Sequence, residues 1–148
     1  MSYSPHTLGI IIGGLLPALM FGISNVLVKA SEEHGISIAL YVFVVGVATI
    51  ICSVVLFFIF PGKQISATSG MYAFLAGSAW VVGITGVFVA LQRFGTPLGV
   101  LVPLYNMNTL VAVLLALWFF AEWKEVHTSS LVLGASLITL GAILVAKA

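Results

Sequence analysis

Five long apolar stretches separated by short polar segments make up almost the whole chain. They run roughly over Leu8–Val28, Ile36–Phe60, Gly70–Leu91, Pro97–Ala121 and Ser130–Ala146. A helix needs about 20 apolar residues to cross a hydrocarbon layer of about 30 Å. Backbone groups in lipid must be satisfied within the segment, and the stretches lack the alternation of barrel strands. The pattern therefore predicts an all-α polytopic membrane helix bundle with five transmembrane helices, whose odd number places the termini on opposite faces.

The polar segments between the stretches hold most of the charge. They read KASEEHG, PGKQISATS, QRFGT and EWKEVHTS, and they carry eight of the nine charged residues. The third segment is so short that the third and fourth spans should form a tight antiparallel hairpin, with Pro97 in the first turn of the fourth. No linker or low-complexity run interrupts the sequence, so residues 1–148 are expected to form one domain.

Composition places the chain in lipid. It has 148 residues, of which 61% are hydrophobic and 6% charged, whereas soluble domains average about 25% charged residues. Nine charged side chains cannot cover the exterior of a soluble fold of this size. A net charge of +1 argues against a nucleic-acid partner. We expect an integral membrane protein of a bacterial or archaeal inner (plasma) membrane.

The N-terminal segment lacks the features of a signal peptide. Residues 1–7 contain no lysine or arginine, and the first apolar stretch ends at a charged turn rather than a small-residue cleavage site. That stretch is expected to stay in the mature protein.

Lysine and arginine are distributed almost evenly between the two sides of the predicted topology. The N-terminal side receives Lys63 and Lys124, and the opposite side receives Lys29, Arg93 and Lys147. Orientation normally follows the side richer in these residues. The bias of two against three predicts either weak insertion in one orientation or insertion in both. A chain that inserts both ways can pair with an inverted copy of itself.

Two segments resemble the EamA repeat of the drug/metabolite transporter superfamily. One is LQRFGTPLGVLVPLYNMNTLVAVLLALWFFAEW, with Pro103 in mid-span and Glu122 just after it, and the other is EVHTSSLVLGASLITLGAILVAK. The opening FGISNVLVKA is similar to the first span of that family, with Phe21 and Gly22 followed by Lys29. Members usually have ten spans in two inverted five-span repeats and move small metabolites by alternating access. A single repeat then implies that two copies associate, as inverted repeats do in many transporters.

The related small multidrug resistance proteins carry a carboxylate deep in the first span, which this chain lacks. Glu32 and Glu33 follow the first predicted span, and Glu122 and Glu125 flank the fourth. The resemblance therefore favours facilitated flux, or coupling through another group, over proton-coupled export of cationic drugs.

The fourth span carries the densest group of polar residues. Tyr105, Asn108, Thr109 and Ala112 share one face of a continuous helix about halfway along it, and Asn106 points elsewhere. Asparagine and tyrosine supply donors and acceptors for an uncharged or zwitterionic solute. The alternative is that the asparagines hydrogen-bond a neighbouring helix and serve packing only.

Several other residues are candidates for the site or its movement. Pro17 and Pro103 lack the N–H that would bond Gly13 and Gly99, so both spans should bend and act as hinges or static kinks. Further candidates for solute binding are Ser24, Asn25, Trp80 and Tyr41.

For a few residues the packing interpretation is the stronger one. Ser78, Thr85 and Gln92 recur every seven residues, a stripe more typical of packing than of binding. Lys29 is expected to extend to the lipid headgroups, with an anion-binding role as its alternative.

The last span has small residues on one side. Gly134, Gly141 and Ala142 belong to this side, which predicts a contact between two copies or packing within one.

Taken together, these features predict a transporter of small polar metabolites that works by alternating access as an antiparallel, dual-topology homodimer. Two alternatives stay open: a scaffold or escort subunit that does not transport, and one half of a ten-span transporter. No nucleophile–base pair or paired acid lies within the spans, so no enzyme is expected. The lone Cys52 forms no intrachain disulfide, and no Cys/His spacing suits a metal. No cofactor is expected, and the expected partners are a solute, lipid and a second copy.

Overall fold

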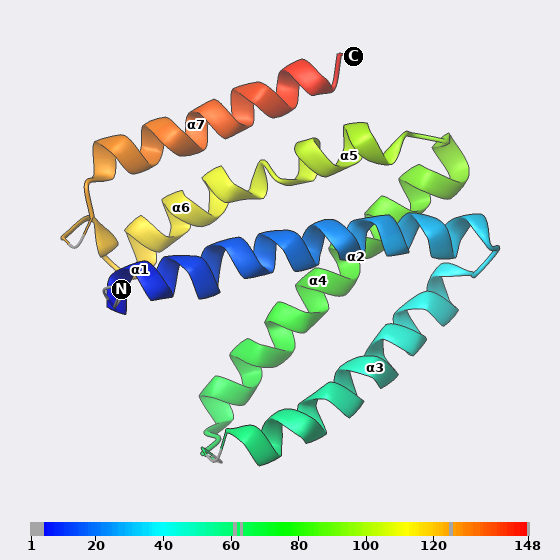
Figure 1. Ribbon diagram of the computed structural model, residues 1–148, viewed down its shortest axis with the longest axis horizontal. Helices are drawn as coiled ribbons and strands as arrows, with labels where there is room; N and C mark the ends of the chain where they lie inside the picture. Colours follow the sequence, from blue (N-terminus) through cyan, green and yellow to red (C-terminus); the bar gives the residue numbers. More distant parts are fainter. Residues whose placement is uncertain (1–4, 61, 63, 125, 148) are drawn as a thin grey trace. The chain divides into compact units, whose positions relative to one another are not determined.

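Every element in the described part of the chain is helical. The computed structural model describes residues 5–60, 62, 64–124 and 126–147. The elements are α1 (Pro5–Ile10), η1 (Ile11–Leu15), α2 (Leu16–Glu33), α3 (Ile38–Ile59), α4 (Ala67–Phe94), α5 (Leu98–Tyr105), α6 (Asn108–Phe119), η2 (Glu122–Lys124) and α7 (Thr128–Val145) (Figure 1). Lys63 and Glu125 lie outside the described residues.

Five stretches are long and apolar enough to cross a membrane, which confirms the predicted fold class. They are Thr7–Glu33, Ile38–Ile59, Ala67–Phe94, Leu98–Phe119 and Thr128–Val145. The chain is an all-α membrane protein with five transmembrane helices. The last, at 18 residues, is the shortest of them, as the sequence predicts.

Two helices extend beyond the predicted span limits, and polar residues account for both extensions. The first span continues to Glu33 rather than ending at Val28, and Lys29 pairs with Glu32 at 2.7 Å one turn later. Pairs at this spacing stabilise a helix end. The third span begins at Ala67 rather than Gly70, where Ser66 and Ser69 form a reciprocal capping box.

A π-helical turn precedes Pro17 in the first span. The N–H of Leu16 donates to the carbonyl of Ile11, five residues earlier. This wider turn places Pro17 near the start of α2, where a missing N–H does little harm. The predicted distortion is present and takes the form of a π-turn. Pro97 lies one residue earlier than predicted, as the N-cap of α5, and its carbonyl accepts from Val100 and Leu101.

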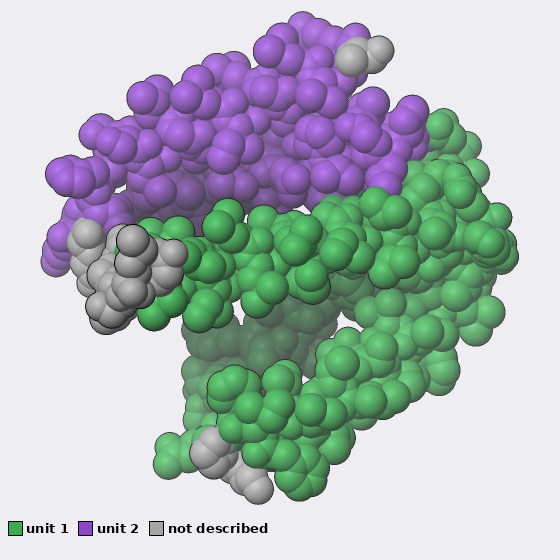
Figure 2. Space-filling model, in the orientation of Figure 1, with its two compact units in different colours: residues 1–95 green, residues 96–148 purple. Residues whose placement is uncertain are grey.

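The chain divides into two compact units, Met1–Gly95 and Thr96–Ala148 (Figure 2). In the first, α2 and α3 both contact α4, and the buried side chains are Val28, Tyr41, Phe88 and Leu91. In the second, α7 packs against α5 and α6, and Leu117, Ala135 and Ala142 are buried. The single domain and the hairpin across Gln92–Pro97 stay predictions, because both concern the junction of the units.

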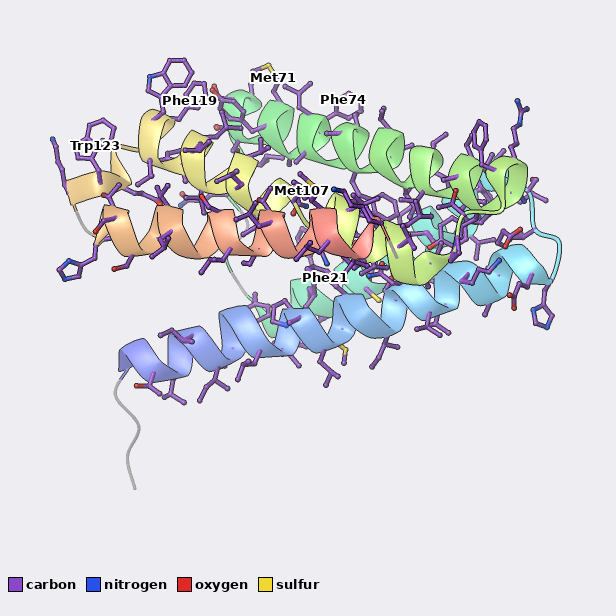
Figure 3. All side chains as sticks on the ribbon, turned by 90° about the horizontal axis from the view of Figure 1, so that it is seen from above. Phe21, Met71, Phe74, Met107, Phe119 and Trp123 are labelled. Carbon is purple, nitrogen blue, oxygen red and sulfur yellow. The ribbon has the colours of Figure 1, made fainter. Side chains whose placement is uncertain are left out.

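Most large apolar side chains are exposed. Phe21, Phe74 and Phe119, labelled in Figure 3, are all more than two-thirds exposed. Cys52 is a free, exposed thiol in α3, which fits the expected contact with lipid or a neighbouring helix. Exposed apolar surface on this scale is stable only in lipid or against other apolar surface.

Candidate functional site

The fourth membrane-spanning helix is interrupted near its middle. Helix α5 ends at Tyr105 and α6 begins at Asn108, with a turn between them (Figure 1). Across this turn the N–H groups of Met107, Thr109 and Leu110 each donate to the carbonyl three residues earlier, at 3.1, 3.0 and 3.0 Å. Bonds of this kind tighten the helix, and such a stretch inside a helix often marks a hinge.

The interruption lies on the C-terminal side of Pro103. The N–H that proline lacks would have bonded Gly99, so its absence affects the turn before Pro103 and not the one after it. Asn106 and Asn108 flank the interruption instead. Asparagine side chains compete with helical hydrogen bonds, which makes asparagine a poor residue for a helix interior. The two asparagines therefore account for the position of the interruption better than the proline does.

Besides Ser69 in the first turn of α4, whose hydroxyl donates to the carbonyl of Ser66, six hydroxyl side chains within the spans bond their own helix. Each donates to a backbone carbonyl three or four residues earlier, at 2.7–3.0 Å; they are Thr49, Ser53, Ser78, Thr85, Ser136 and Thr139. A hydroxyl bonded in this way is satisfied even when its helix faces lipid. The stripe of Ser78 and Thr85 thus needs no ligand and no second helix.

A second group of polar side chains in the spans makes no hydrogen bond to any described residue. Six of them lie away from the ends of the first and fourth spans, and we call these six the unpartnered polar group: Ser24, Asn25, Tyr105, Asn106, Asn108 and Thr109. The others, among them Ser31, Tyr41, Thr68, Tyr72, Thr128, Ser129 and Ser130, lie nearer the ends of their helices. Five of the six are residues that the sequence singles out as candidate binding residues. An unmade hydrogen bond in hydrocarbon costs several kcal/mol, so each of these groups requires water, a solute or a polar partner.

The group has one part in each compact unit. Ser24 and Asn25 lie on α2 in the first unit, and the other four surround the interruption in the second. Asn25 lies eight residues before Glu33, at which α2 ends. At 1.5 Å per residue, Asn25 lies roughly 12 Å from that end.

The shared face predicted for the fourth span must also be corrected. Asn108, Thr109 and Ala112 lie on α6, but Tyr105 is the last residue of α5. Because the turn between them tightens the backbone, a continuous 3.6-residue repeat does not relate Tyr105 to the other three.

Tyr41 and Trp80 differ in their surroundings. Tyr41 is 9% exposed, and its ring centroid lies 4.8 Å from that of Phe88, which is fully buried. Trp80 lies on α4 and is 49% exposed. The structure therefore brings Tyr41 into the core of the first unit and leaves Trp80 on its surface.

Lys29 and Gln92 have partners at one end of the first unit. The ammonium of Lys29 lies 2.7 Å from Glu32 and 3.5 Å from Glu33. This local neutralisation weighs against the anion-binding alternative for Lys29. The Nε2 of Gln92 donates to the carbonyl of Ile36 at 3.1 Å, which joins the end of α4 to the turn before α3.

The small residues of α7 have mixed environments. Ala142 is 3% exposed within the single chain, Gly134 is half-buried and Gly141 is exposed. Ala142 thus takes part in packing within the chain, and a contact between copies through Gly134 and Gly141 stays a prediction.

An open hollow of about 360 Å³ lies elsewhere, at the connection between α3 and α4. Its lining includes Phe57, Ile65 and Ala73, with Gln64 and Ser69 as the polar members. None of the predicted binding residues lines it.

Sequence reasoning underrated Asn106 and missed the helix interruption. The available signal was the tripeptide Asn106-Met107-Asn108, which places two helix-disfavouring residues in the centre of an apolar run. It also missed Phe88, whose burial only tertiary packing determines.

No family model, curated protein or solved structure matches this chain. The resemblance to the EamA repeat therefore stays a prediction from the motifs, and only the chain's own residues indicate its function.

Proposed function

We propose that this protein transports small, uncharged or zwitterionic polar metabolites across the membrane by alternating access. It works as an antiparallel, dual-topology homodimer of a single five-span, EamA-like repeat. The solute binds at the interruption of the fourth span, to Tyr105, Asn108 and Thr109. Asn25 and Ser24 of the first span are further candidates for polar contact with a solute.

The observation that carries this proposal is the unpartnered polar group. Six polar side chains lie within spans that are otherwise apolar, and they bond nothing in the described chain. By contrast, hydroxyls near the middle of other spans, such as those of Thr49, Ser78 and Thr139, bond carbonyls of their own helices. Non-helical backbone and polar groups at membrane depth occur where they line a cavity or are covered by protein.

The chemistry of the group indicates the class of solute. Amide and hydroxyl side chains both donate and accept hydrogen bonds without carrying charge. The charged residues that the structure describes lie at the span ends, where Lys29 pairs with Glu32. A site without a counter-charge favours solutes with no net charge, because an unpaired ion in a low-dielectric medium is costly.

The homodimer is supported by the size of the bundle and by its charge. No residue in the most apolar window of the first or the second span is buried in the chain, so these helices leave room for a partner. The nearly even lysine and arginine count gives little instruction on orientation. An inverted pair of five-span units reproduces the arrangement that many transporters obtain by internal repetition.

Uptake into vesicles tests the proposal. Purified protein is reconstituted into liposomes and offered a panel of radiolabelled sugars, polyols and amino acids, beside the variants Asn108→Ala and Tyr105→Phe. Loss of one or two hydrogen bonds to the solute should reduce uptake of the transported compound about tenfold in Asn108→Ala. Tyr105→Phe, which removes one hydroxyl, should reduce it less.

Leu115→Ala is the matched control, because Leu115 is an exposed apolar residue of α6 and should transport like the parent. Normal uptake by both polar variants would mean that the solute binds at a site without Asn108 and Tyr105. A panel that gives no uptake by the parent, in a protein that retains its helical signal, would favour the scaffold alternative.

A further inference from the structure

All the buried residues of the first unit lie toward one end of its helices. Its buried residues are Val28 near the end of α2, Tyr41 near the start of α3, and Phe88 and Leu91 near the end of α4. The partly buried residues around them fall in 25–32, 36–45 and 81–90. Because α2 ends where α3 begins, these three segments meet at the same membrane face.

The other end of the unit has almost no packing. Residues 46–60 of α3 and its exit are all exposed, as are residues 71–80 of α4 and, apart from Pro17, residues 8–24 of the first span. Figure 2 shows the first unit, in green, hollowed between α2 and the atoms of α3 and α4. The three helices are thus fastened together at one membrane face and separate toward the other.

Few polar or aromatic side-chain contacts between described residues join α3 to α4 at the fastened end. One ring pair, Tyr41 with Phe88 at 4.8 Å, and one side-chain hydrogen bond, Gln92 to the carbonyl of Ile36 at 3.1 Å, connect α3 and its preceding turn to α4. Hydrogen bonds of this kind contribute little net stability. A contact this small can open without unfolding the helices, whose own backbone bonds are unaffected.

The unpartnered Asn25 lies directly beside the fastened end. It is three residues before Val28, so the two share a face of α2, and it lies on the side toward the open end. The packed layer therefore separates Asn25 from the membrane face at which α2 ends. Outside this layer the charge of Lys29 is neutralised by Glu32 and Glu33.

We propose that this packed layer is the gate of the first unit on that membrane face, and that the side chain of Gln92 is its latch. The structure then represents the state closed on this face and open toward the other. The inference rests on the proposed transport, since a gate has a purpose only if a solute passes. Gln92 is a positioning residue that acts through the Ile36 carbonyl and does not touch the solute.

Distances between spin labels across the gate test this proposal. Cysteines replace His34, directly after α2, and Phe94, the last residue of α4, which are both exposed residues at the fastened end, in a Cys52→Ala background. Labelled protein is mixed with a large excess of unlabelled protein in lipid bilayers, so that only label pairs within one chain contribute. The gate predicts two distances in the parent, one from the closed state and a longer one from the open state.

Gln92→Ala should raise the ratio of open to closed molecules about fivefold, the effect of losing the net contribution of one hydrogen bond. Ser78→Ala is the matched control, because the Ser78 hydroxyl bonds only Phe74 of its own helix, and it should leave the ratio unchanged. A single narrow distance in the parent would overturn the gate, whether or not the Gln92 variant folds. Two distances with a ratio that Gln92→Ala does not move would overturn the latch.

The result is independent of vesicle uptake. Two distances without any solute uptake would leave the gate standing and remove the proposed function. Uptake together with one fixed distance would support the proposed function and overturn the gate.

Discussion

At the scale of single residues, the polar side chains of the spans differ in whether their own helix can satisfy them. A serine or threonine hydroxyl reaches a carbonyl one turn back, as Thr85 does with Val81 at 2.8 Å. An asparagine amide has two donors and a two-lone-pair acceptor, which one helix cannot satisfy. All three asparagines of the chain lie in spans, and none has a side-chain partner among the described residues. Asparagines are thus the most informative residues for locating a site here.

Tyr41 is expected to act through its ring and not through its hydroxyl. Because its ring packs on the buried Phe88, Tyr41→Ala should destabilise the protein by about 3 kcal/mol. Tyr41→Phe keeps the ring and should leave both the melting temperature in detergent and solute uptake near those of the parent. Phe58→Ala, at a residue 86% exposed, is the control for loss of a lipid-facing ring and should change stability little. A large loss of uptake in Tyr41→Phe without a loss of stability would mean that the Tyr41 hydroxyl contacts the solute.

The sequence alone predicts which polar residues in the spans are candidates for solute binding. Polarity inside an apolar run selects Asn25, Tyr105, Asn108 and Thr109 directly, since lipid penalises any unpaired polar group equally in every fold. Whether a residue such as Tyr41 faces a solute or another ring depends on Phe88, 47 positions away in the chain. Single-sequence patterns do not contain such pairings.

At the scale of elements, the interruption of the fourth span is the main departure from a regular helix. Lipid strongly favours continuous helices, because every backbone group must be bonded. The turn at Asn106 and Met107 keeps its N–H groups bonded, that of Asn106 to the carbonyl of Val102 and that of Met107 to the carbonyl of Leu104. It is thus tolerated in lipid and still provides a place where α5 and α6 can move relative to each other.

The asparagines, and not the proline, are expected to maintain this interruption. Asn106→Leu should favour a continuous helix, which raises the melting temperature and lowers uptake, because the hinge and one polar group are lost. Pro103→Ala should have the smaller effect on uptake, since its missing bond lies on the N-terminal side of the turn. Leu115→Ala serves as the control for a substitution in α6. A larger effect of Pro103→Ala than of Asn106→Leu would make the proline the hinge after all.

Element boundaries were predictable to within a few residues where hydropathy alone sets them. The second span was expected over Ile36–Phe60 and is Ile38–Ile59. The apolar pattern of the first span ends at Val28, five residues before the helix does, because the segment after Val28 begins with the charged Lys29. Lys29 is instead accommodated by Glu32 at 2.7 Å, within the last turns of the helix. Hydropathy profiles omit this kind of local pairing.

At the scale of the whole molecule, the balance of charge between the two sides governs insertion. Reporter fusions at the N and C termini should each give signal on both faces of the membrane, because two basic residues oppose three. Combining Gln64→Lys with Arg93→Gln reverses the bias. One side then carries Lys63, Lys124 and the new lysine, and the other carries Lys29 and Lys147, so the majority orientation should invert. Gln64→Glu with Arg93→Lys is the control, since acidic residues contribute little to orientation. A single orientation in all of these proteins would exclude the antiparallel homodimer.

A transporter of this kind requires that water and solute reach the interruption of the fourth span in the middle of the membrane. Hydrogen–deuterium exchange in lipid nanodiscs measures this without knowledge of the solute. We predict that the amides of Met107, Thr109 and Leu110 exchange much faster than those of Thr49 to Ser53, which lie inside the uninterrupted, lipid-facing α3. Equal and strong protection of both segments would mean that no water reaches the site, and it would contradict a transport function.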